Sequence, residues 1–393
     1  MSETIRDAVG TARRAELDRL GLMDSPSTER LDRFTRMARE IFRVQDAQIS
    51  LLDDTRLFVK SHVGAVARQG VEAPISAAFC SETIRADRTF VVEDSTTEAS
   101  RSAYPAVHVD PGFPFYAGHP LTTGGQRIGA LCIFDDKPRR LSSGEMQMLA
   151  ELAQLVETEL DAVVEVERAS VVQRALLPRS VPDIAGYDLA GDCLATRGVS
   201  GDFYDWYPVE NGLTLTLADV MGKGSGAAII AATIRATLRA GARSADPVDA
   251  VESASDALVD DLDGAATFAT LFHARLETAS GELRFVDAGH GLTIIVREDG
   301  TSERLASDDL PLGIGVGARR TAATAVLGAG DALVSVSDGV LDLYDGALTT
   351  LDEVEAIVRR SVDSGAIVSA LIDLARAADA PDDVTVLALR RTA

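Results

Sequence analysis

The sequence has 393 residues, enough for two domains of ordinary size or for one large domain with a spacer. It carries 38 basic and 61 acidic side chains, a formal net charge of −23, which argues against nucleic-acid binding and against docking on an anionic membrane surface. Its hydrophobic and charged fractions of 46% and 25% are typical of a globular protein and exclude disorder for the bulk of the chain.

Targeting signals and cysteine usage favour a cytoplasmic protein. The N-terminal 15 residues have no apolar core before a small-residue cleavage site, so no secretory signal is recognised. The three cysteines (Cys80, Cys132 and Cys193) are widely spaced and form no CxxC pair, as expected of buried thiols in a reducing compartment. Residues 1–165 have 19 basic and 26 acidic side chains, and residues 166–393 have 19 and 35, so the acidity belongs mainly to the second half.

After an N-terminal segment, residues 1–24, the pattern over residues 25–141 predicts an α+β domain. Ser25–Arg30 has the residues of a helix start, and the apolar residues from Leu31 to Phe42 then recur at helical spacing. Short strand-like runs follow at residues 47–53, 57–63, 89–94, 114–121 and 127–136.

Residues 142–177 predict one long connecting helix. Leu149, Leu152, Val156, Leu160, Val163 and Val166 recur every three or four residues, and Pro178 ends the pattern. Because this stripe is narrow, we expect a coiled coil with a second copy of the chain, that is, a homodimer. The alternative is a single helix that lies on its own domain.

Residues 178–393 predict an α/β sandwich, two sheets flanked by helices. Strands are expected at residues 213–220, 267–276, 283–289, 292–298, 331–338 and 383–390. Helices are expected at residues 226–241, 247–262, 351–361 and 366–377.

Aspartates stand at the ends of apolar strands in this region. Asp202, Asp219 and Asp338 each lie beside a glycine or a turn, and Asp382 and Asp383 open the last strand. Clustered carboxylates without a basic partner repel one another unless a cation lies among them, and oxygen-only ligand sets suit Mg²⁺ or Mn²⁺. The alternative is that each aspartate caps a helix or an Asx turn.

Other phosphoryl-transfer and hydrolytic chemistries lack their motifs. The spacings of Arg85, Arg139 and Arg197 after the three cysteines do not fit a cysteine phosphatase. Leu217 stands where the Walker pattern needs a glycine before Gly222. The sequence also contains no HExxH zinc motif and no GxSxG nucleophile elbow.

The second half resembles a metal-dependent protein phosphatase of the PPM (type 2C) superfamily, in its bacterial SpoIIE/RsbU-like branch. Eight pieces in the family's order carry the resemblance: Gln173–Pro178, Ser200–Asp205, Asp219–Ala228, Phe268–Phe272, Asp287–His290, Leu310–Gly315, Ser337–Val340 and Pro381–Leu387. The first half resembles a GAF sensor domain through Val59–Gly64, Phe79–Ile84, Phe115–Leu121 and Ile128–Arg139.

The PPM resemblance implies two divalent cations, Mn²⁺ or Mg²⁺, that activate water for attack on phosphorus. Asp219 would bridge both cations, with help from the Val220 carbonyl. Asp338 and Asp382 would hold one cation and Asp202 the other, so these four aspartates are the candidate catalytic residues. Asp383, where many relatives have Asn, is a secondary candidate ligand.

Some positions depart from the family pattern. Met221 stands where other branches have a His that is a candidate general acid. His290 is a possible acid, but a turn histidine is more often structural. Lys223 has two open interpretations, screening of substrate phosphate or capping of the next helix.

The resemblance therefore implies a cytoplasmic phosphatase that removes phosphate from Ser or Thr of a protein, regulated by the GAF domain. The expected partner in this branch is an anti-sigma-factor antagonist in a partner-switching pathway. The alternatives are a non-catalytic pseudophosphatase that sequesters a partner, and a small-molecule phosphohydrolase. The sequence identifies no GAF ligand.

Overall fold

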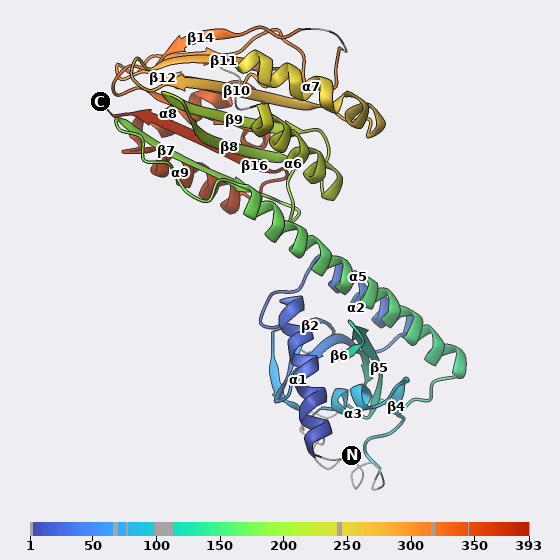
Figure 1. Ribbon diagram of the computed structural model, residues 1–393. Helices are drawn as coiled ribbons and strands as arrows, with labels where there is room; N and C mark the ends of the chain where they lie inside the picture. The colour runs from blue at the N-terminus through green and yellow to red at the C-terminus, as the bar shows by residue number, and fades with distance from the viewer. Residues whose placement is uncertain are drawn as a thin grey trace. The chain divides into compact units, whose positions relative to one another are not determined.

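A computed structural model describes residues 3–65, 70–75, 78–97, 99, 113–241, 246–315, 317, 319–344 and 346–392. The chain divides into two compact units, residues 1–165 and residues 166–393, and we describe each by itself (Figure 1). None of the helices in these described ranges is both long and apolar enough to cross a membrane.

The first unit is built on a six-stranded antiparallel sheet with strand order β3-β2-β1-β6-β5-β4. Its strands are β1 (Asp46–Leu52), β2 (Arg56–Val63), β3 (Glu72–Pro74), β4 (Phe90–Val92), β5 (Phe115–Thr123) and β6 (Gln126–Asp135). Its helices are α1 (Glu3–Leu20), α2 (Glu29–Phe42), α3 (Cys80–Arg85) and the beginning of α5 (Ser143–Leu176). The predicted α+β architecture is confirmed.

Apolar clusters cover both faces of this sheet. One cluster joins residues of β1, β5 and β6 to α1, α2 and α5. The other lies on the opposite side and includes Phe79, Cys80 and Ile84 of α3 and its flank. The sequence pattern did not predict α1, because in its last turns only Leu17 and Leu20 are buried in the core.

The long helix is confirmed as α5, Ser143–Leu176. A capping box begins it: the Glu145 amide donates to Ser142 Oγ (3.2 Å), and the Ser142 amide donates to Glu145 Oε2 (2.8 Å). The first four residues of the predicted stripe, from Leu149 to Leu160, are buried in the core of the first unit. These four residues therefore lie on their own domain, as in the alternative interpretation. The side chain of Val163 is outside the described residues.

The second unit contains two five-stranded antiparallel sheets, ordered β14-β11-β10-β9-β8 and β13-β12-β15-β16-β7. The first sheet consists of β8 (Asp202–Val209), β9 (Gly212–Val220), β10 (Ala269–Glu277), β11 (Glu282–Ala288) and β14 (Ala323–Val326). The second consists of β7 (Tyr187–Leu194), β12 (Thr293–Val296), β13 (Ser302–Leu305), β15 (Ala332–Val336) and β16 (Val384–Arg391).

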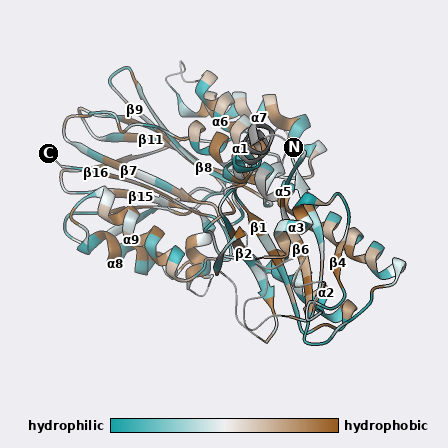
Figure 2. Ribbon diagram, turned by 90° about the horizontal axis from the view of Figure 1, so that it is seen from below, coloured by the Kyte–Doolittle hydropathy of each residue, from teal (hydrophilic) through white to brown (hydrophobic). Residues whose placement is uncertain are grey.

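These sheets form the predicted sandwich. One apolar core lies between them and includes Trp206, Phe272 and Leu387. Helices α6 (Ser225–Ala240) and α7 (Pro247–Gly264) cover the outer face of the β8–β11 sheet. Helices α8 (Thr350–Arg360) and α9 (Ser364–Ala377) cover the outer face of the other sheet (Figure 1). Figure 2 shows hydrophobic and hydrophilic residues mixed along α8 and α9, as expected of helices with one buried side.

Candidate active site

Two acidic side chains face each other across neighbouring strands. Asp202 begins β8 and Asp219 lies near the end of β9, and the two are register partners in the antiparallel ladder. Asp202 is 4% exposed, and Asp219 is partly buried. Gly201 precedes Asp202 with no room for a side chain, because a Cβ there would lie 2.7 Å from the Val220 carbonyl oxygen. The strand ends therefore pack closely around this acidic pair.

The second sheet contributes the other three aspartates. Asp338 follows β15 and begins a 3-10 helix, η4 (Asp338–Leu343). Asp382 and Asp383 immediately precede β16, which pairs with β15. All five aspartates line one cavity of about 250 Å³, together with Gly201, Met221, Gly222, Lys223, Phe268 and Thr270. The fold thus brings together all five aspartates that the sequence singled out.

Burial and mutual repulsion raise the pKa values of three of these carboxyls. Burial, and then the charge of Asp219, raise the pKa of Asp202 well above its usual range. Burial and the charge of Asp338 raise the pKa of Asp219 to about 6. Partial burial and the charge of Asp382 raise the pKa of Asp338. An added cation would offset this repulsion, since it stabilises the ionised carboxylates.

The residues of the cavity fit divalent cations in their donor chemistry. The candidate ligands are hard oxygen atoms, as Mg²⁺ and Mn²⁺ prefer. Asp202 Oδ2 is buried and has no hydrogen-bond partner, which is costly for a carboxylate oxygen unless a cation satisfies it. Within the described ranges, however, no three His, Cys, Asp or Glu side chains are already drawn together as a formed metal site. Cation binding would therefore have to draw the carboxylates together.

Asp383 differs from the other acids in its contacts. Its Oδ1 accepts hydrogen bonds from the Thr196 amide (2.8 Å) and hydroxyl (2.9 Å), and its Oδ2 accepts one from the Gly201 amide (3.2 Å). The carboxylate thereby holds the loop that leads into Asp202. These contacts suit a positioning role better than the secondary ligand role.

His290 and Lys223, the two basic residues whose roles the sequence left open, have different surroundings. His290 is buried, and its Nε2 lies 3.1 Å from Ser335 Oγ, so its contacts are structural. Burial lowers the pKa of His290 to about 3, which leaves it uncharged at neutral pH. Lys223 Nζ lies 2.6 Å from Asp382 Oδ2, whereas the cap residue of α6 is Gly224, which makes no side-chain cap. Capping by Lys223 is therefore not observed.

Sequence reasoning assigned no role to Gln173, which contacts the loop before Asp202. Gln173 Nε2 donates to the Ser200 carbonyl (2.6 Å), and Gln173 Oε1 accepts from the Ser200 amide (2.9 Å). The residue lies in the last turn of α5, and only its place in the family-like piece Gln173–Pro178 could have indicated a role for it. It is a link between the long helix and the candidate site.

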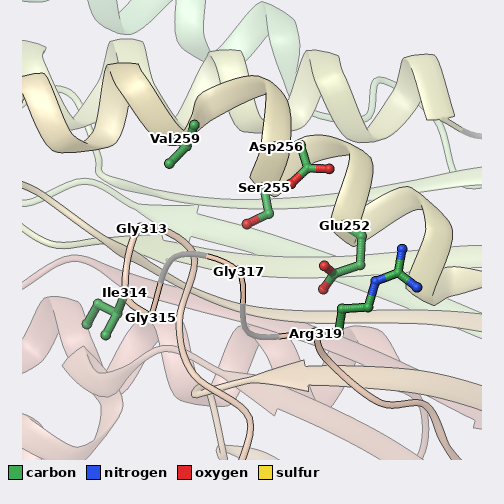
Figure 3. A pocket seen from close by; sticks show the side chains of 9 residues that line it. All are labelled: Glu252, Ser255, Asp256, Val259, Gly313, Ile314, Gly315, Gly317 and Arg319. Carbon is green, nitrogen blue, oxygen red and sulfur yellow. The ribbon is translucent and has the colours of Figure 1, made fainter.

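A larger cavity of about 410 Å³ lies between α7 and the loop around Gly313. Figure 3 shows Glu252, Ser255 and Asp256 on the helix and Arg319 on the loop side. Glu252 Oε1 already accepts hydrogen bonds from the amide and the guanidinium of Arg320. Because Glu252 and Asp256 both lie on α7, the described residues of this cavity do not form an acidic cluster like that of the smaller cavity.

Two family models match this chain. Residues 210–392 match "Stage II sporulation protein E (SpoIIE)", and residues 27–160 match "GAF domain". The SpoIIE match includes Asp219, Asp338 and Asp382 but begins after Asp202.

Curated relatives match parts of the chain. The phosphoserine phosphatase RsbU of Bacillus subtilis is 27% identical over 179 residues, which cover 45% of this chain and 53% of RsbU. The cyclic di-GMP phosphodiesterase PA2567 of Pseudomonas aeruginosa is 33% identical over 147 residues, 37% of this chain and 24% of that protein. The chain thus spans no more than about half the length of these relatives.

A solved structure supports the fold. The SiaA-PP2C domain of Pseudomonas aeruginosa aligns with a TM-score of 0.51 and 21% identity, over 59% of this chain and 98% of that domain. At this identity the likeness shows the sandwich fold alone.

Proposed function

We propose that this chain, in which a GAF domain precedes a domain of the SpoIIE family, is a metal-dependent phosphatase that hydrolyses phosphoserine or phosphothreonine in a protein. The observation that carries the proposal is the convergence of aspartates from both sheets on one cavity, where a buried Asp202 oxygen has no partner. The similarity to a phosphoserine phosphatase supports the choice of substrate class.

Two divalent cations, Mn²⁺ or Mg²⁺, are the proposed cofactors. Asp219 would hold both with help from the Val220 carbonyl, Asp338 and Asp382 would hold one, and Asp202 the other; the four aspartates line the cavity. When bound, the cations supply a water of lowered pKa and offset the charge that develops on the phosphoryl group. The aspartates would hold and orient the cations at the ends of the strands.

Neither position considered for a histidine acid supplies a proton to the leaving group in this cavity. Met221, 45% exposed, occupies the position of the candidate acid of other branches. His290 is buried against Ser335 and is not among the residues that line the cavity. We therefore infer that water or another group of the cavity supplies this proton.

The proposed regulation runs through α5. Its first half is buried in the core of the GAF unit, and its Gln173 holds the backbone of Ser200, two residues before Asp202. A signal that moves this helix would change the position of a metal ligand. Homodimerisation through the helix is part of the proposal, and Val171 and Val172 (60% and 62% exposed) are available for it.

The proposed substrate is a phosphorylated anti-sigma-factor antagonist of a partner-switching pathway. This choice rests on the likeness to the SpoIIE/RsbU-like branch. We propose that the protein acts in the cytoplasm, where such a partner would be found.

Replacing the bridging ligand tests the proposal. In the Asp219→Asn variant, Mn²⁺-dependent release of phosphate from a phosphoserine peptide should fall by at least about 100-fold. Losing a metal ligand costs more than losing a residue that only hydrogen-bonds to a ligand, and that loss alone typically costs about 10–100-fold. The matched control is Asp373→Asn, since Asp373 lies on α9 with its side chain 72% exposed. Phosphate release should require added Mn²⁺ or Mg²⁺ and stop on chelation.

Equal turnover by Asp219→Asn and the wild type would contradict the assignment of the site. Partner binding without turnover would favour a pseudophosphatase. Faster hydrolysis of free nucleotides than of phosphoprotein would favour a small-molecule phosphohydrolase.

A further inference from the structure

Lysine is rare in this chain, and one lysine lies at the candidate site. Only three of the 38 basic residues are lysines: Lys60, Lys137 and Lys223. Lys223 is thus the one lysine of residues 166–393, and the other Lys and Arg positions there are all arginine. A compact ammonium differs from a guanidinium because it is a point charge on a flexible stem, which resembles a metal ion more closely.

The backbone around Lys223 gives its side chain freedom to move. Gly222 and Gly224 flank it with φ angles of 110° and 81°, in a region that other residues rarely adopt. A Cβ added to either glycine would meet nothing within 4 Å, so the loop is open on both sides of Lys223. The loop joins β9, which ends with Val220, to α6.

The ammonium group of Lys223 lies among the candidate ligands. Nζ is 2.6 Å from Asp382 Oδ2 and 3.2 Å from the Pro381 carbonyl oxygen. Its charge also opposes the rise in the pKa of Asp338 that burial and Asp382 cause. Lys223 and Asp382 are 32% and 31% exposed, so their ion pair is weak enough to exchange.

We propose that Lys223 is a tethered cation that competes with a divalent metal ion for Asp382 and, once displaced, binds the phosphoryl group of the substrate. The inference rests on the proposed function, because only a phosphatase site would bring a substrate phosphoryl group to Lys223 as its second partner. An ammonium group 2.6 Å from Asp382 Oδ2 and a divalent cation bound to the same carboxylate would repel each other, so cation binding favours the departure of Nζ. The displaced ammonium stays at the cavity wall, where a phosphate dianion would enter.

Removing the charge of Lys223 should raise the affinity for Mn²⁺, because a competitor is lost, and lower the affinity for phosphate, because a binding partner is lost. In Lys223→Gln, Mn²⁺ should bind about fivefold more tightly, which corresponds to the upper range for a partly exposed ion pair. Inorganic phosphate should bind the Mn²⁺-loaded variant about fivefold or more weakly, because a charge-assisted contact is lost. Lys223→Arg keeps the charge and should remain near the wild type for Mn²⁺.

Both affinities are measured on the full chain by titration calorimetry, and unbound Mn²⁺ is followed independently by electron paramagnetic resonance. Arg376→Gln is the control for net charge, because Arg376 pairs with exposed Asp373 on α9 (3.1 Å) and lies outside the cavity lining. Tighter Mn²⁺ binding with weaker phosphate binding in Lys223→Gln alone supports the proposal.

Three results would overturn it. Unchanged Mn²⁺ affinity in Lys223→Gln would show that no competition exists, and weaker Mn²⁺ affinity would show that the lysine only maintains the loop. Both results leave the proposed phosphatase function intact, because the wild type still binds metal. A wild type that binds no Mn²⁺ or Mg²⁺ would overturn the proposed function, and this inference with it.

Discussion

Asp205 and two arginines form a buried ionic cluster that fixes α6 to β8. Asp205 is 2% exposed and accepts hydrogen bonds from Arg239 Nε (2.6 Å) and Nη2 (2.7 Å). Arg235 Nε lies 3.3 Å from the same carboxylate, and the Trp206 amide also donates to it (3.0 Å). Since β8 begins with Asp202 and α6 follows the Lys223 loop, the cluster connects both sides of the candidate site.

Replacing Asp205 by Asn would leave two arginines without their counter-charge. Removing one partner of a buried ion pair costs about 3–5 kcal/mol. We take the lower end, about 3 kcal/mol, because Arg239 is 41% exposed and water can solvate it. For a unit of this size, each kcal/mol corresponds to about 2–4 °C, so the melting temperature should fall by about 6–12 °C.

The single tryptophan makes this assay specific for the second unit. Trp206 is 5% exposed, and its indole donates to the Ser180 carbonyl (3.0 Å). Its fluorescence during thermal unfolding therefore follows the sandwich and not the first unit. The exposed-acid control, Asp373→Asn, should melt within about 2 °C of the wild type. A melting temperature of Asp205→Asn equally close to the wild type would refute the reasoning.

Two further predictions concern the sandwich. Gln173→Ala should lower phosphate release several-fold while the melting temperature drops by only a few degrees, because its two hydrogen bonds position the backbone of Ser200. A fall in phosphate release that comes with a large drop in melting temperature would indicate simple destabilisation instead. Burial lowers the pKa of His273 to about 4 from 6.5, so the unfolded chain binds the proton first and stability falls as pH decreases from about 6.5 to 4, by up to about 3 kcal/mol. His273→Asn should reduce this pH dependence in denaturant titrations, and an unchanged slope would contradict the assignment.

The sequence predicted the elements whose apolar pattern is strong. The helix at residues 142–177 and the predicted strand at 331–338 agree with α5 and β15 because each has a regular apolar period. The predicted strands did not include β8, since acidic Asp202 and Asp205 interrupt its apolar residues. They also did not include β13 and β14, which are short and mostly exposed.

The aspartates of the site were recognisable from their place at strand ends, but their contacts were not. Asp383 reads in the sequence like Asp382, yet it binds the loop at Thr196 instead of facing Lys223. The ion pair between Lys223 and Asp382 joins residues that are 159 positions apart, which no local pattern encodes. Similarly, the structural role of Asp205 is visible only in the fold, where α6 places Arg239 beside it.

The end of α5 sets a constraint on the chain's length within the second unit. Gln173 faces Ser200, and Leu177, whose amide donates to the Gln173 carbonyl, packs against the apolar cores of the sandwich. Each residue of an α-helix turns the chain by about 100°. The identities of residues 174–176 can therefore vary, but inserting or deleting one residue among them would rotate Gln173 out of phase with Leu177. At this point of the chain the number of residues matters more than their identity.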